Sequence, residues 1–168
     1  MKASQARRLG DFVGHFYTRH EDFTDTQTDE IIRAVAQQSR DYLPDQAILA
    51  VVEQKDAVPL VLAATDNRVY ALEVESVDKD GPATTRCRLL RLNPASCSVS
   101  AVLRYSGSHR FGVRRTHWRF QIHDTGGNLD VTVTGRQDSD GEMDQGALLG
   151  KHLAVRLGWE FPSMGDSE

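Results

Sequence analysis

The sequence predicts an α+β protein in which a seven-strand antiparallel sheet, shaped as a barrel or sandwich, is capped by a C-terminal helix. Two further helices are expected to precede the sheet. Apolar residues recur at helical spacing over the first forty residues and near the C-terminus, and at a period of two in between. The 168 residues, 39% of them hydrophobic, are enough to form a core without disulfides. We expect a helical pair packed on the barrel (1–44), the barrel with its helix (45–160) and a frayed tail (161–168).

The two N-terminal helices are predicted from apolar residues that fall on one helical face. In the first helix this face consists of Leu9, Phe12, Val13 and Phe16. The second has Thr26 or Thr28 as its N-cap and is ended by Pro44. Its buried side is expected to hold Ile31, Ile32, Val35 and Leu43.

Alternation of apolar and polar residues predicts the strands at about 47–53, 58–65, 68–75, 84–92, 97–105, 114–123 and 128–135. The short links between them predict a meander of antiparallel neighbours, with a four-residue turn at 93–96. This turn places Leu92 opposite Cys97 and Val102 opposite Cys87, which leaves the two cysteines too far apart to bond. One core is expected to contain Trp118, Phe120, Leu103, Val131 and Val133, covered by Leu149 and Leu153 of a helix at about 142–159.

Seven short strands followed by one amphipathic helix resemble the element order of the pleckstrin-homology (PH) superfold. The stretch 61–72, VLAATDNRVYAL, is similar to the second and third strands of bacterial PH-like domains. The resemblance covers about residues 46–159 and implies a binding module for a lipid, peptide or protein. Lipid-binding PH domains carry several bases on their first hairpin, whereas here Lys55 stands between Glu53 and Asp56, so membrane phosphoinositides are not the expected ligand.

The composition is that of a protein expected in the cytoplasm. Neither a signal peptide nor an apolar stretch long enough to span a bilayer is recognisable. Two cysteines fit a reducing compartment, in which both are expected to stay reduced.

Charge is distributed unevenly along the chain. Residues 83–123 contain eight arginines and no acidic residue, although the whole chain has a net charge of −4. The predicted binding residues are Arg110, Arg114, Arg115, His117 and Arg119, because guanidinium groups in a row suit carboxylates or phosphates. The alternative is a solvated charged surface whose arginines pair with acids such as Glu73, Glu75, Asp78 and Asp80.

Catalytic and metal-binding patterns are weak. The histidines and cysteines lack the spacing of a metal site, and Ser106, Ser108 and His109 read as a flexible loop. The sequence therefore favours a non-catalytic module that binds an acidic protein or peptide and needs no cofactor or metal. Nucleic acid is disfavoured because the aromatic residues near the arginines alternate toward the core. Two alternatives remain: the protein forms a homodimer, or it has a small-ligand or enzymatic site at the open end of the barrel.

Overall fold

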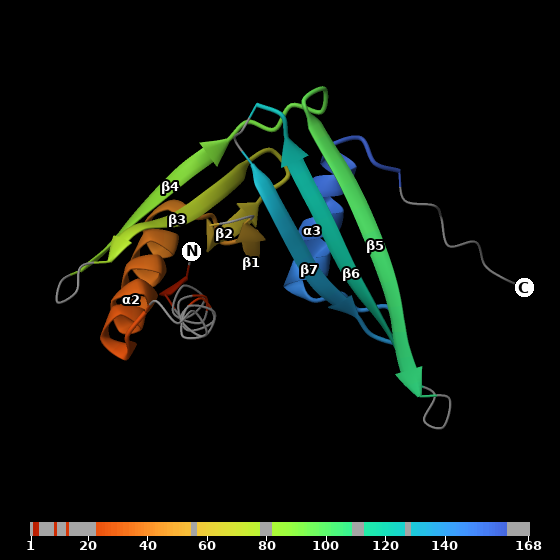
Figure 1. Ribbon diagram of the computed structural model, residues 1–168, viewed down its shortest axis with the longest axis horizontal. Helices are drawn as coiled ribbons and strands as arrows, with labels where there is room; N and C mark the ends of the chain where they lie inside the picture. Colours follow the sequence, from red (N-terminus) through yellow and green to blue (C-terminus); the bar gives the residue numbers. More distant parts are fainter. Residues whose placement is uncertain are drawn as a thin grey trace, which may run out of the picture. The chain divides into compact units, whose positions relative to one another are not determined.

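The computed structural model describes residues 2, 3, 9, 13, 23–54, 57–77, 82–108, 113–126 and 129–160. These residues form an α+β fold with a seven-stranded antiparallel sheet and a C-terminal helix, as predicted (Figure 1). The described helices are α2 (Asp25–Tyr42) and α3 (Gln145–Arg156). The strands are β1 (Ile48–Gln54), β2 (Ala57–Ala64), β3 (Val69–Val77), β4 (Ala83–Leu90), β5 (Cys97–Ser108), β6 (Val113–Asp124) and β7 (Asp130–Gln137).

The strands are arranged as two meanders, one in each of two compact units of the chain. The unit Met1–Arg91 contains the order β4-β3-β2-β1, and the unit Leu92–Glu168 contains β7-β6-β5. Adjacent strands in each meander are antiparallel, with Val61 opposite Leu72 in the first and Leu103 opposite Trp118 in the second. In the described part of the chain β4 and β5 are edge strands, so the sheet is not closed into the expected barrel.

The turn at 93–96 does not join neighbouring strands, contrary to the prediction. β4 pairs with β3, and β5 pairs with β6. The turn is instead attached to the end of β6, because the Thr125 N–H donates to the Ser96 carbonyl at 2.9 Å and the Ser96 hydroxyl donates to Asp124 at 2.8 Å. The expected register between Leu92 and Cys97 is therefore wrong, although both cysteines are free thiols.

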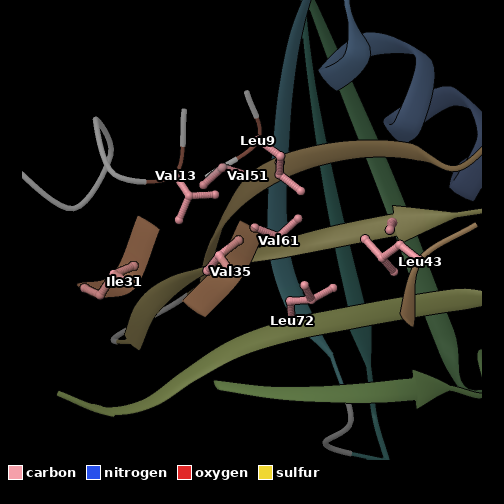
Figure 2. Packing of buried hydrophobic residues seen from close by; sticks show 9 residues of the cluster. Leu9, Val13, Ile31, Val35, Leu43, Val51, Val61 and Leu72 are labelled. Carbon is pink, nitrogen blue, oxygen red and sulfur yellow. The ribbon is translucent and has the colours of Figure 1, made fainter. Parts of the chain in front are cut away.

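In the first unit, α2 packs on one face of the meander. Buried side chains of the helix meet buried side chains of the strands in one cluster (Figure 2). Its members are Leu9, Val13, Ile31, Val35, Leu43, Val51, Val61, Ala63 and Leu72. The central strands β1 and β2 are buried on both faces, which explains why 60–64 reads as a continuous apolar run rather than an alternation.

Helix α2 begins two to four residues earlier than predicted. Its N-cap is Thr24, whose hydroxyl accepts from the Gln27 N–H while the Gln27 side chain accepts from the Thr24 N–H. This reciprocal pair satisfies two backbone donors that a helix start leaves open, so neither Thr26 nor Thr28 is the cap. The first predicted N-terminal helix and the tail at 161–168 lie largely or wholly outside the described residues.

In the second unit, α3 packs on β6 and β7. Phe120, Val131 and Val133 of the strands and Leu149 and Leu153 of the helix are all buried, as predicted. Trp118 is stacked on Phe120, with ring centroids 5.5 Å apart.

Leu103 does not belong to this core, although its face was assigned correctly. It lies opposite Trp118, but it is 39% exposed because β5 is an edge strand.

Candidate functional site

The face of β5, β6 and β7 that lies opposite α3 carries the candidate site. Side chains alternate along a strand, so the burial of Trp118, Phe120 and Ile122 places the residues between them on the other face. Arg115 and Arg119 are exposed there, with His117 between them. The two arginines are four residues apart, which is about 13 Å along the strand.

The strand register adds one arginine on each side of His117. Arg104 of β5 and Arg136 of β7 both lie directly opposite His117. With neighbouring strands about 4.8 Å apart, these three residues form a row about 10 Å long across the sheet. We call the set Arg104, Arg115, His117, Arg119 and Arg136 the basic face.

The arginines of the basic face are exposed and have no charged partner among the residues that the structure describes. Within the described ranges, none of the four forms an ion pair or a side-chain hydrogen bond. His117 Nε2 lies 2.8 Å from the Ser106 hydroxyl, so that ring is held in place on the strand. The basic face therefore presents several positive charges at fixed backbone positions, with no counter-ion supplied by the described residues.

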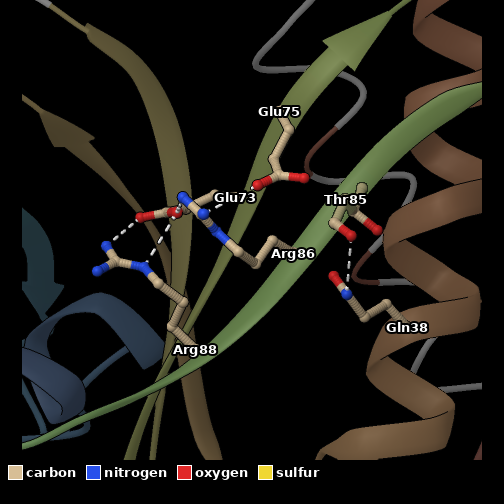
Figure 3. A network of polar contacts seen from close by, with 6 residues as sticks. All are labelled: Gln38, Glu73, Glu75, Thr85, Arg86 and Arg88. Carbon is tan, nitrogen blue, oxygen red and sulfur yellow. Dashed lines mark hydrogen bonds and ion pairs between the residues drawn. The ribbon is translucent and has the colours of Figure 1, made fainter.

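The arginines of β4 behave differently and match the alternative of a paired charged surface. Arg88 and Arg86 both bind the Glu73 carboxylate, and Arg86 also lies 3.0 Å from Glu75 (Figure 3). Burial raises the pKa of Glu73, but hydrogen bonds from Arg88 and Arg86 and their positive charges outweigh it, so the pKa lies below its usual value. The acid-free stretch therefore contains two kinds of arginine.

The structure places three of the five predicted site residues on one face. Arg115, His117 and Arg119 are described in full, and Arg114 lies in β6 with its backbone opposite Gly107. Arg110 lies outside the described residues. Arg136 was missed because it falls beyond the acid-free stretch. Its spacing from Val131 and Val133 would have assigned it to the same face as His117.

The pair Ser106 and His117 lacks the acid of a catalytic triad among the described residues. It lies on an open strand face, and no acid in the described part of the chain orients the His117 ring. His123, on the same strand, lies 3.4 Å from Asp130. No group of three histidine, cysteine or acidic side chains among the described residues could hold a metal ion.

Comparison with known proteins found no matching family model, no matching curated protein and no matching solved structure. Among the described helices, neither is long and apolar enough to cross a membrane. Inferences about function therefore depend on the residues of the chain itself.

Proposed function

We propose that this protein is a non-catalytic, PH-like interaction module that binds an acidic protein or peptide through its basic face. The observation that carries the proposal is the set of four exposed arginines around His117 that have no acidic partner among the described residues. In the other unit, by contrast, Arg86 and Arg88 of the acid-free stretch are paired with glutamates. The chain thus neutralises one group of arginines and leaves the other available.

The PH-like part of the proposal is supported by element order. A four-strand meander and a three-strand meander are followed by a C-terminal helix that packs on the last strands. The stretch that resembles bacterial PH-like domains forms the β2–β3 hairpin, where the Thr65 N–H donates to the Arg68 carbonyl at 2.8 Å.

Carboxylates suit this surface because arginine donates two parallel hydrogen bonds to one carboxylate. Binding need not break an existing ion pair, and the strand backbone already fixes the spacing of the arginines. Nucleic acid is a poorer fit, since Trp118 and Phe120 are buried on the other face and provide no surface on which bases could stack.

The alternative of a ligand or enzymatic site depends on the end of a closed barrel. The sheet is open among the described residues, so this location has less support than the basic face. No arrangement of described side chains favours a different catalytic site, and the basic face remains the better candidate.

A charge-reversal experiment tests the proposal. The probe is a fluorescent peptide of alternating glutamate and valine, blocked at both ends, whose binding is followed by anisotropy at low salt. We expect Arg115→Glu with Arg119→Glu to weaken binding by about tenfold or more, which corresponds to about 1.4 kcal/mol. Folding should be retained, because surface charge changes usually cost less than about 0.5 kcal/mol.

The matched control reverses two exposed arginines of the other unit, Arg33→Glu with Arg68→Glu. Both double variants have the same net charge, so a difference between them reports the location of the charges. Equal binding by the two double variants would mean that the basic face is only a solvated surface.

A further inference from the structure

We infer that the acidic partner binds as an extended segment that adds an eighth strand to the free edge of β5. This inference rests on the proposed function, because the same arginines would hold the partner's carboxylates. It specifies how the partner binds and which pattern of residues it must have.

β5 is an edge strand whose outer side is unpaired among the described residues. It runs for 12 residues, Cys97–Ser108, and pairs with β6 alone. Native proteins usually keep edge strands short or covered, since unpaired N–H and C=O groups attract another chain. A strand of this length offers several such groups to a partner.

The hydrogen bonds at the base of the hairpin identify which residues face the free edge. The Thr125 N–H donates to the Ser96 carbonyl, so in the β5–β6 ladder the even-numbered residues of β5 point their backbone groups toward β6. The N–H and C=O groups of Val99, Ala101 and Leu103 therefore point outward. These groups are the ones that an added strand would pair with.

Side chains at the same edge are exposed on both faces of the sheet. Val102 is 46% exposed on the basic face, and Leu103 is 39% exposed on the opposite face. A strand added beside them would shield part of each side chain from water. The lack of a neighbouring strand on this side of β5 thus explains why both apolar side chains are exposed.

The positive charge on β5 indicates which kind of segment can bind at its edge. Arg104 is the single charged residue of β5, and it begins the row that continues through His117 to Arg136. A partner strand places one side chain directly opposite Arg104, where a carboxylate is favoured. The partner is therefore an extended segment with acidic residues at alternate positions and apolar residues between them.

A second copy of this chain is disfavoured as the occupant. Two β5 strands paired about a two-fold axis form one continuous sheet and bring two basic faces side by side. Their arginines would repel each other, whereas an acidic segment neutralises them. The edge is thus suited to a heterologous partner.

Backbone methylation of the alternating glutamate–valine peptide tests the inference on the intact protein. In an added strand, every second N–H of the peptide points at β5 and the others point away. We prepare one peptide N-methylated at the glutamates and one N-methylated at the valines. We expect one of them to lose binding by about tenfold or more and the other to bind nearly as well as the unmodified peptide.

A protein variant tests the same contact from the other side. Ala101→Pro removes an outward N–H and leaves the hydrogen bonds to β6 in place, since proline is tolerated where a strand N–H faces solvent. Ala101→Val retains the N–H and serves as its matched control. We expect Ala101→Pro alone to weaken peptide binding, with its folding verified by thermal unfolding.

The outcomes separate the two proposals. If the unmodified peptide binds and depends on Arg115 and Arg119, but both methylated peptides bind equally, the added strand is wrong and the proposed function stands. If the unmodified peptide does not bind to the wild-type protein, the proposed function is wrong, and the added strand, which rests on it, is wrong as well. A wild-type dimer in sedimentation that Ala101→Pro converts to monomers would show that a second copy occupies the edge, which overturns the inference.

Discussion

Among single residues, Glu73 is an acid whose charge contributes to the stability of the first unit. Its side chain is 15% exposed and is bound by two arginines. Replacing Glu73 with Gln should lower the free energy of unfolding at neutral pH by about 1–3 kcal/mol, because two guanidinium groups lose their charged partner. Urea unfolding followed by far-ultraviolet circular dichroism, which reports helix α2 and the strands of the first unit, measures this difference.

The pH dependence of the same variant has a defined sign. The pKa of Glu73 is lowered in the folded protein, so its contribution is complete above the unfolded-state pKa of about 4.3 and is lost as the pH falls through the lower folded-state value. The stability difference between wild type and Glu73→Gln should therefore shrink below about pH 4. Glu30→Gln, which affects an ion pair on the exposed side of α2, is the control and should change stability by less than about 1 kcal/mol. A difference that stays constant to low pH would contradict the assigned role.

At the scale of elements, the hydrophobic pattern predicted all seven strands because it records local burial, although 60–64 of β2 is a continuous apolar run and not an alternation. It failed where a distant pairing decides the structure. The short turn at 93–96 favours a hairpin, yet β4 and β5 have different neighbours because Ser96 bonds to Asp124 and Thr125 instead. Leu103 fits the apolar alternation of its strand but is exposed. Alternation predicts which face of the sheet a side chain lies on, but it does not predict whether the strand lies at the edge of the sheet.

The contact between α3 and β7 depends on glycines that bring two backbones close together. A Cβ on Gly146 of α3 would overlap the Thr134 carbonyl oxygen, and a Cβ on Gly135 would overlap the backbone of Ala147. Gly146→Ala should lower the free energy of unfolding by about 1–3 kcal/mol or more. The added methyl group can be accommodated only if α3 moves away from β7 or if the backbone of β7 shifts within the sheet. Leu148→Ala, at an exposed position of the same helix, is the control. Equal chemical-unfolding midpoints for the two variants would show that α3 can shift away from β7 at little cost.

For the whole molecule, the sequence located the arginines but not their division into paired and unpaired sets. Residues 83–123 contain arginines of both units, and their linear order does not reveal which strand supplies an acid. Glu73 reaches Arg86 and Arg88 only because β3 and β4 are neighbours in this register. Arg136 joins the basic face for the same reason, through the register of β6 and β7. The candidate site is a property of strand pairing more than of composition.

The unpaired arginines should make salt act in opposite directions on folding and on binding. Arg115 and Arg119 lie about 13 Å apart, and Arg104 and Arg136 about 10 Å apart, so they repel one another at low salt, where screening reaches about 30 Å at 0.01 M. Replacing Arg115 and Arg119 with Gln should raise the free energy of unfolding at low salt by a few tenths of a kcal/mol, and this gain should vanish near 1 M NaCl, where the screening length is about 3 Å. The same range of salt should weaken binding of the acidic peptide to wild type and have a smaller effect on the variant.

Urea unfolding and peptide anisotropy, measured on both proteins across the salt series, test the two effects together. A variant that is less stable than wild type at low salt would mean that these arginines have a stabilising partner in the folded protein, and the basic face would then no longer be available for an acidic ligand.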